Sequence, residues 1–281
     1  MNDLIQPKRI GMVCRGEDED VLVLERLIEC VDERAEVVLD EETAYKLKKQ
    51  GMKIEEMDVD FLTCIGGDGT ILRTLHYLKS PTPVLGINMG AIGFLAEVQP
   101  ENAVSALTKI LEGFEVERRE RLSVVVKGKM GKERMPYAMN EAVVITSNPG
   151  KMLHFAIFVD DDELDRLRAD GVVFATPTGS TAYAMSAGGP IVDPKVDAAI
   201  IVPIAPFKLS ARPTVVDINT VISLELFGMK EAELVIDGQF YRRIGKEDRI
   251  SITRGEPAFF VKIWDKHFLR LHGKLRIEDE K

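Results

Sequence analysis

The sequence predicts an α/β domain, with a parallel sheet and helices on both faces, followed by an all-β domain of sandwich type. In the first part of the chain, short apolar strands alternate with amphipathic helices, which is typical of parallel sheets covered on both faces. After about residue 114, short strand-like runs follow one another with almost no helical periodicity between them. The 281 residues are enough to bury two separate cores.

The first domain is predicted over residues 1–113. Its strands are short apolar runs, expected at Arg9–Cys14, Glu36–Leu39, Phe61–Ile65 and Val84–Ile87. Each is followed by a helical pattern. The first helix has one apolar face from Val21 to Val31, and the last begins at Pro100 and is closed by Gly113. Ligands of such sheets bind beyond the carboxyl ends of the strands, so polar residues at those ends are the first candidates for a site.

The second domain is predicted over residues 114–265, with the boundary near Gly113–Glu117. Its expected strands are Leu122–Lys127, Tyr137–Thr146, His154–Val159, Gly171–Thr176, Ala198–Pro203, Val221–Phe227, Ala232–Ile236, Arg249–Ile252 and Phe259–Trp264. Residues 266–281 have a helical period through Phe268, Leu271 and Leu275. A lone helix after a β domain has little to pack on, so we expect this tail helix to return to the first domain.

Composition and charge exclude several classes of protein. A net charge of −9 argues against a general nucleic-acid-binding surface. No apolar run approaches the roughly 20 residues that span a bilayer, and Met1–Arg9 lacks the apolar core of a signal peptide. The three cysteines are scattered and read as reduced thiols, so we expect a cytoplasmic protein without a zinc site. There is also no Walker A pattern.

A glycine-rich turn between the third strand and its helix is the main candidate site. Gly66, Gly67 and Gly69 allow backbone N–H groups to approach a ligand, and the helix directs its positive dipole end at the turn. These glycines and Thr70 are therefore predicted to hold a phosphate donor. Asp68 would repel phosphate but suits a hydroxyl or a cation, which suggests phosphoryl transfer to an alcohol with Asp68 as the base. The alternative is that Asp68 only caps the helix and nothing binds.

Two stretches of the second domain carry further candidates. Asn140–Glu141 interrupts an apolar strand, and a buried carboxylate needs partners. The pair is either a ligand-binding pair at a strand bend or a β-bulge with internal hydrogen bonds. Thr176–Tyr183 combines a strand end, a hydroxyl-rich glycine turn and a short helix, which favours binding of an anion or a polar ligand. Asp170–Gly171 and Asp237–Gly238 are, in isolation, turn signals.

These motifs, in this order, resemble the NAD kinase family, also called inorganic polyphosphate/ATP-NAD kinases. The resemblance rests on Gly66–Thr70, Gly86–Leu95, Asn140–Glu141, Asp170–Gly171 and Thr176–Tyr183. It implies an N-terminal α/β domain and a C-terminal β domain with NAD bound between them. It implies transfer of a phosphoryl group, from ATP, another nucleoside triphosphate or polyphosphate, to the 2′-hydroxyl of the adenosine ribose of NAD, forming NADP. It also implies a divalent cation, usually Mg²⁺, and a homodimer or homotetramer.

The resemblance also assigns roles to single residues. Asp68 matches the family's proton acceptor. The residues that match its NAD site are Asp68, Gly69, Arg73, Asn140, Glu141, Lys151, Arg168, Asp170, Thr178, Thr181, Ala182, Tyr183, Ala184, Met185, Ser186, Ala205 and Gln239. The sequence contains no cluster of carboxylates that identifies metal ligands, so the metal site stays unknown and phosphate oxygens would supply most of its coordination.

Two other functions remain as alternatives. The first is a lipid or sugar kinase of the same superfamily, although no basic amphipathic segment for a membrane surface is visible. The second is a non-catalytic module that binds NAD or NADP without transferring phosphate. The presence of Asp68 beside an intact glycine turn argues against the second alternative.

Overall fold

The computed structural model describes residues 4–90, 93–129, 131–228 and 231–263. The chain forms two compact units. The second comprises Arg119–Pro257, and the first comprises the chain before Arg119 and again from Ala258 onward. The tail helix predicted over residues 266–281 lies outside the described residues.

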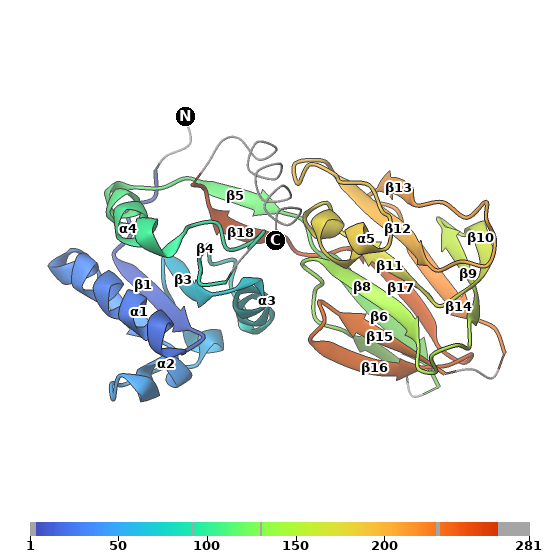
Figure 1. Ribbon diagram of the computed structural model, residues 1–281, viewed down its shortest axis with the longest axis horizontal. Coiled ribbons are helices and arrows are strands. Elements are labelled where there is room, and N and C mark those ends of the chain that lie inside the picture. Colours follow the sequence, from blue (N-terminus) through green and yellow to red (C-terminus); the bar gives the residue numbers. More distant parts are fainter. Residues whose placement is uncertain (1–3, 91–92, 130, 229–230, 264–281) are drawn as a thin grey trace. The chain divides into compact units, whose positions relative to one another are not determined.

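The first unit is built on one sheet, drawn in Figure 1, whose strand order among the described residues is β2-β1-β3-β4-β18-β5. The four N-terminal strands and β18 pair in parallel. The strands are β1 (Arg9–Cys14), β2 (Glu36–Leu39), β3 (Phe61–Gly66), β4 (Val84–Asn88), β5 (Val116–Arg119) and β18 (Ala258–Val261). The predicted parallel sheet is confirmed.

Helices cover both faces of this sheet. On one face α1 (Asp18–Val31) packs beside α4 (Ala103–Glu112), and their apolar residues share a core with Ile10, Met12 and Phe61. On the other face lies α3 (Asp68–Tyr77), where the Sγ of Cys64 donates to the Oγ1 of Thr74. The remaining helices are short: α2 (Glu41–Lys46), η1 (Asp32–Arg34), η2 (Ile54–Glu56) and η3 (Pro100–Asn102).

The return of the chain to the first sheet corrects the predicted domain boundaries. The second domain was expected over residues 114–265, with Phe259–Trp264 as one of its strands. Instead β18 lies between β4 and β5, with Phe260 opposite Val84. The edge of β4 needs a hydrogen-bonding partner, and β18 supplies it. The sequence of a strand does not show which sheet the strand joins. Phe259–Trp264 was assigned to the second domain because it follows the strands of that domain in the sequence.

The second unit is a sandwich of two antiparallel sheets. One sheet has the order β10-β9-β14-β17-β6-β7, and the other, which we call the site sheet, has the order β13-β12-β11-β8-β15-β16. Their bounds are β6 (Leu122–Gly128), β7 (Gly131–Arg134), β8 (Glu141–Thr146), β9 (Leu153–Val159), β10 (Asp162–Ala169), β11 (Gly171–Ala175), β12 (Ala198–Ile204), β13 (Thr214–Asp217), β14 (Ile222–Leu226), β15 (Ala232–Ile236), β16 (Phe240–Ile244) and β17 (Arg249–Arg254).

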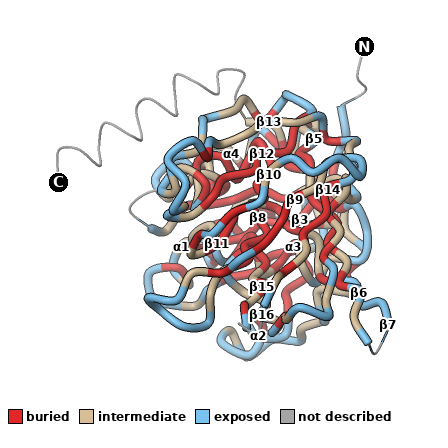
Figure 2. Tube along the Cα trace, turned by 90° about the vertical axis from the view of Figure 1, so that its right-hand side faces the viewer, coloured by how far each residue is buried: buried red, intermediate tan, exposed pale blue. Residues whose placement is uncertain are grey.

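One apolar core fills the space between the two sheets. Val144, Val172 and Phe174 of the site sheet are fully buried in it, together with Phe155 and Leu224 of the facing sheet. Figure 2 shows β11 buried along its length. The opposite face of the site sheet carries a smaller apolar cluster, which is covered by the helix α5 (Tyr183–Ser186) that follows η4 (Thr178–Thr181). The position of this helix brings the predicted hydroxyl-rich loop onto the site sheet.

Candidate active site

The turn after β3 has the geometry of a strand–turn–helix phosphate site. Gly66 has φ +158°, and a Cβ there would lie 2.4 Å from the Oγ1 of Thr70, so the protein itself requires a glycine. A Cβ at Gly67 or Gly69 would have no heavy atom within 4 Å. Because the space is open and the backbone conformation is ordinary at Gly67, the fold itself does not require a glycine there. A ligand that approaches the backbone closely would require one.

The carboxylate of Asp68 binds the backbone of the segment that follows β4 and does not cap α3. Its Oδ2 accepts the backbone N–H of Phe94 at 2.8 Å, and its Oδ1 accepts those of Leu95 and Ala96 at 3.0 and 2.9 Å. Gly67 is the residue that precedes the helix, and it offers no side-chain cap. The simple capping alternative is therefore wrong. An ionised carboxylate has about four lone-pair positions, so these three bonds leave room for one further donor.

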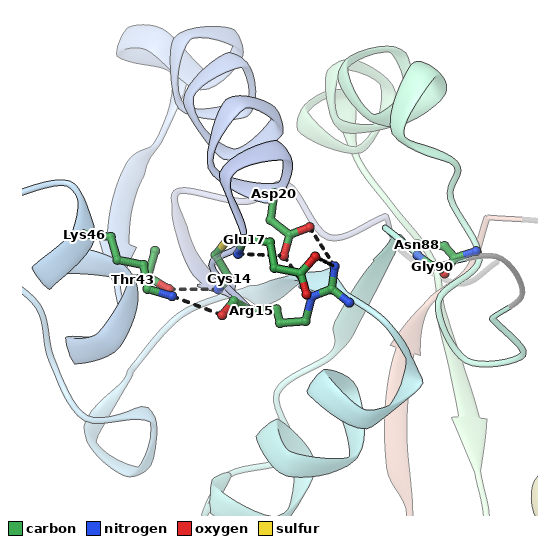
Figure 3. A network of polar contacts seen from close by, with 8 residues as sticks. All are labelled: Cys14, Arg15, Glu17, Asp20, Thr43, Lys46, Asn88 and Gly90. Atoms are coloured by element: carbon green, nitrogen blue, oxygen red, sulfur yellow. Dashed lines mark hydrogen bonds and ion pairs between the residues drawn. The ribbon is translucent and has the colours of Figure 1, made fainter.

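Two cationic residues near the turn were not predicted from the sequence. Arg15 follows β1, and its N–H donates to the carbonyl of Ile65 at 2.9 Å. Its guanidinium pairs with Asp20 at 3.0 Å and with Glu17 at 2.9 Å (Figure 3). The ammonium of Lys46 donates to the carbonyl of Arg15 at 3.0 Å. Because the carboxyl ends of parallel strands share one edge of a sheet, the place of Arg15 after β1 was the available signal.

Asn88 ends β4 beside Gly66, with which it pairs across the sheet. Its side chain is buried, and its Oδ1 accepts the N–H of Gly90 at 3.1 Å (Figure 3). Met89 donates its N–H to the carbonyl of Gly66 at 3.0 Å. The motif Gly86–Leu95 is thus tied to the Asp68 turn by a backbone bond of Met89 and by the carboxylate of Asp68.

Arg73, a predicted NAD contact, has a protein partner in this structure. Its Nη1 lies 3.0 Å from the Oε2 of Glu42. Both residues line a cavity of about 330 Å³, together with Lys53, Tyr77 and others. The structure therefore directs Arg73 toward α2.

In the second unit, the segment that carries Asn140 and Glu141 forms a kink held by one carboxylate. Asp237 accepts the backbone N–H groups of Met139 at 2.8 Å, Asn140 at 2.8 Å and Glu141 at 3.0 Å. In return its own N–H donates to the carbonyl of Glu141 at 3.0 Å. Asp237 is 6% exposed and has φ +49°, a conformation that aspartate tolerates better than most residues. The sequence predicted the turn at Asp237 but not this role.

Glu141 is a buried acid with an unsatisfied oxygen. The residue is 7% exposed, and its Oε2 has no hydrogen-bond partner among the described residues. Burial, and after it the nearby charge of Asp237, raises the pKa of the Glu141 carboxyl to about 8, while the backbone N–H of Tyr183 acts in the opposite direction. The side chain is therefore largely neutral at pH 7. The backbone of the pair is internally hydrogen-bonded, as the second alternative expected, whereas ligand binding by Glu141 stays a prediction.

The hydroxyl-rich loop packs directly on this kink. A Cβ at Gly179 would lie 2.0 Å from the carbonyl oxygen of Asn140, so the two backbones meet with no room for a side chain. Thr176 donates its N–H to the carbonyl of Asn140 at 2.9 Å and its hydroxyl to that of Met139 at 2.7 Å. The structure thus brings Asn140, Glu141 and the loop together.

Several hydroxyls of the loop form hydrogen bonds to backbone groups, which stabilise the conformation of the loop. Ser180 donates to the carbonyl of Pro177 at 2.6 Å and accepts the N–H of Val192 at 3.1 Å. Thr181 donates to the carbonyl of Thr178 at 3.3 Å. In α5, Ala184 is buried against the site sheet, while Tyr183 and Ser186 are exposed and Ala182 and Met185 are half-buried. Gln239 closes the turn after β15, where its N–H donates to Ile236.

Four predicted contacts lie at the opposite end of the site sheet. Glu141 pairs with Ala175 at one end of β8 and β11, whereas Ile145 pairs with Gly171 at the other. Asp170 donates to the carbonyl of Ile204 at that far end, next to Ala205, which has φ +44°. Lys151 and Arg168 are exposed and adjoin the same end. The hydroxyl of Thr146 donates to the carbonyl of Lys151, and the N–H of Phe207 donates to the carbonyl of Arg168. The six residues of β8 separate the two groups by about 17 Å, so one chain does not assemble all of the predicted contacts around Glu141.

The described residues supply no ready-made metal cage, because no group of three or more His, Cys, Asp or Glu side chains could hold an ion. Over the described part of the chain, each helix is too short or too polar to cross a membrane. Within that part Cys14, Cys30 and Cys64 are free thiols.

Comparison with known proteins gives one consistent result. The family models described as ATP-NAD kinase N-terminal domain and ATP-NAD kinase C-terminal domain match residues 16–115 and 139–262. An NAD kinase of Methanosarcina acetivorans is 43% identical over 275 residues, 95% of this chain and 98% of the relative. An NAD kinase of Methanothermobacter thermautotrophicus is 46% identical over 276 residues, 95% of this chain and 96% of the relative.

Solved structures agree with these relatives. The crystal structure of an NAD kinase from Archaeoglobus fulgidus in complex with ATP is 37% identical, covers 95% of this chain and 98% of its own, and has a TM-score of 0.77. Yeast NADH kinase complexed with NADH, at 23% identity and a TM-score of 0.84 over 96% of this chain and 86% of its own, shows the same fold.

Proposed function

The chain belongs to the NAD kinase family, and we propose that the Asp68 turn of its first unit and the Asn140–Glu141 kink of its second unit carry the reaction. That reaction is the transfer of a phosphoryl group from ATP to the 2′-hydroxyl of the adenosine ribose of NAD, which forms NADP. The lipid or sugar kinase and the non-catalytic module are set aside by the family membership.

Asp68 is proposed as the general base. Phosphoryl transfer asks the protein mainly for alignment and charge neutralisation, with a base near the attacking hydroxyl. The three backbone N–H donors fix the Asp68 carboxylate in direction, and they leave about one lone-pair position for the 2′-hydroxyl. The fixed carboxylate is the observation that carries this assignment.

The phosphate donor is proposed to lie on the Gly66–Thr70 turn. The open space at Gly67 and Gly69, together with the positive dipole end of the ten-residue helix α3, supports close approach of phosphate to the backbone. The resemblance implies a divalent cation, Mg²⁺. Phosphate oxygens would supply most of its ligands, because the described residues contain no group of three or more His, Cys, Asp or Glu side chains that could hold it. Bound there, it would neutralise phosphate charge.

NAD is proposed to be held by the kink and the loop packed on it. Asn140, Glu141, Thr178 and the residues from Thr181 to Ser186 form this group, with Gln239 in the adjoining turn. Gly69 and Arg73 of the first unit are kept as NAD contacts by resemblance. Lys151, Arg168, Asp170 and Ala205 are kept as nucleotide contacts by resemblance. Their separation from Glu141 within one chain is consistent with the homodimer or homotetramer expected for the family. A cytoplasmic location is also proposed.

A direct assay tests the proposal. The full chain is incubated with Mg²⁺, ATP and NAD, and NADP formation is followed. Loss of turnover in Asp68→Asn, with NAD still bound, is expected. Tight NAD binding without any NADP formation by the unaltered protein would overturn the assignment of the reaction to these two sites.

A further inference from the structure

Asp237 has two effects on the candidate nucleotide site, one through hydrogen bonds and one through its charge. Its carboxylate is the shared acceptor of three consecutive backbone N–H groups, from Met139 to Glu141, and it is itself buried. A single side chain therefore sets the backbone of both residues proposed to bind NAD. No other acceptor for these three N–H groups is needed.

The charge of Asp237 also acts on the side chain of Glu141. Two buried carboxyl groups close to each other do not both ionise readily, because each charge disfavours the other. The carboxyl oxygens of Asp237 accept three backbone N–H groups, whereas Glu141 has an oxygen without a partner. Burial of Glu141, and after it the charge of Asp237, raises the pKa of the Glu141 carboxyl to about 8, so this side chain carries a proton at pH 7.

Two other groups bear on this pair. The backbone N–H of Tyr183, from α5, favours the ionised form of Glu141. Arg121, just before β6, interacts with the charge of Asp237, and its guanidinium also donates to the carbonyl of Glu256 at 2.7 Å and lies 4.9 Å from the ring of Tyr137. These contacts reduce the repulsion between the two carboxyl groups without supplying a partner to the Glu141 Oε2.

We propose that Asp237 is a positioning residue of the NAD site, which fixes the Asn140–Glu141 kink and keeps a proton on Glu141 until ribose hydroxyls of the nucleotide displace it. This inference rests on the proposed function. On binding, hydroxyl groups donate to the Glu141 carboxylate, the O–H bond of its carboxyl group breaks, and the proton passes to the buffer. No group is oxidised or reduced in this step. Nucleotide binding and proton release are thereby coupled.

The coupling predicts a measurable number of protons. With a pKa of about 8, roughly nine-tenths of the Glu141 side chains carry the proton at pH 7, so NAD binding should release about 0.9 proton. Isothermal titration calorimetry of the full chain with NAD, in phosphate and in Tris, measures this number from the difference in the heats. The release should vanish near pH 9.5, where Glu141 is already ionised.

Variants separate the roles. Glu141→Gln should bind NAD with no release from this group. Asp237→Asn should release fewer protons at pH 7 than the unaltered protein, since the repelling charge is gone while the burial of Glu141 remains. Asp160→Asn is the matched control, because Asp160 also has a positive φ of 50° and accepts one backbone N–H, from Val221 at 2.8 Å, in the other sheet. It should release as many protons as the unaltered protein.

Three results would overturn the inference: NAD binding at pH 7 without proton release, a release that persists in Glu141→Gln, or an unchanged release in Asp237→Asn. If Asp237→Asn fails to fold, two measurements still test the proton on Glu141. They are the pH dependence of proton release by the unaltered protein and the proton release by Glu141→Gln. Absence of both NAD binding and NADP formation would instead refute the proposed function itself.

Discussion

The Oδ2 of Asp68 accepts the backbone N–H of Phe94 at 2.8 Å, and this bond joins the first turn of α3 to the segment that follows β4. The residue proposed as the base is therefore also a structural tie. Any substitution of Asp68 removes the proposed base and also weakens these hydrogen bonds. Experiments on this residue therefore need a control variant that loses only hydrogen bonds of the same kind.

Asp68→Asn should lower the rate of NADP formation by roughly 10²–10⁴-fold, the usual contribution of a general base. The amide nitrogen would also face an N–H that the carboxylate now accepts, which should lower the free energy of unfolding by about 1–3 kcal/mol. Steady-state kinetics and urea denaturation measure the two effects. Asp40→Asn is the control without the chemistry, because Asp40 also accepts backbone N–H groups on both oxygens, from Glu42 on Oδ2 and from Thr43 on Oδ1. A folded Asp68→Asn with near-normal turnover would refute the base assignment.

Gly66 and Gly67 form a second matched pair. Gly66→Ala should lower the free energy of unfolding by about 1–3 kcal/mol, because its Cβ would meet the Oγ1 of Thr70. Gly67→Ala should leave stability unchanged, since nothing lies within 4 Å of its Cβ, but should raise the KM for ATP about tenfold or more if phosphate rests on this backbone. An unchanged KM for ATP in Gly67→Ala would place the donor elsewhere.

Gly179→Ala should disrupt the NAD site from within. Its Cβ would lie 2.0 Å from the carbonyl oxygen of Asn140, and both are backbone positions that cannot rotate away. We expect weaker NAD binding and a lower melting temperature. Gly245→Ala, at a position with nothing within 4 Å, is the control in the same unit and should change neither quantity.

Glu141 should make stability depend on pH. Its pKa is raised from 4.5 to about 8, so the folded chain holds this proton more tightly than the unfolded chain does. The contribution of Glu141 to the free energy of unfolding is complete below about pH 4.5, falls as pH rises to about 8, and is level above that value.

Glu141→Gln should remove this decline. Between pH 5.5 and 8.5 the unaltered protein should lose on the order of 2–4 kcal/mol more than the variant, as measured by urea denaturation. Glu163→Gln should behave like the unaltered protein, because Glu163 is exposed and its ion pair with Arg166 lowers its pKa. Parallel pH profiles of the unaltered protein and Glu141→Gln would contradict the raised pKa.

Much of the fold could be predicted because the buried strands are short apolar runs. Arg9–Cys14 and Glu36–Leu39 have the predicted bounds. β10 was missed, since only Leu167 and Ala169 among its residues are buried and the rest are mostly charged and exposed. β18 was recognised as a strand but placed in the wrong sheet, because sheet membership depends on contacts far away in the sequence.

The candidate site divides in the same way. Asp68, Asn140 and Glu141 stood out because a carboxylate among glycines or inside an apolar strand needs an explanation. Asp237 did not, since an Asp–Gly turn has the same sequence signal whether its carboxylate faces water or binds three buried N–H groups. The wide separation of Asp170 from Glu141 could not be predicted either, because it depends on the register of β8 and β11.

The position of β18 between β4 and β5 has a consequence for synthesis on the ribosome. The second unit is continuous in sequence, so it can fold as soon as Pro257 has left the exit tunnel. The four strands β1 to β4 are translated before the second unit, but the first sheet is completed only later, because β18, which lies between β4 and β5, is translated after the whole of the second unit. Until then the edge of β4 has no strand partner.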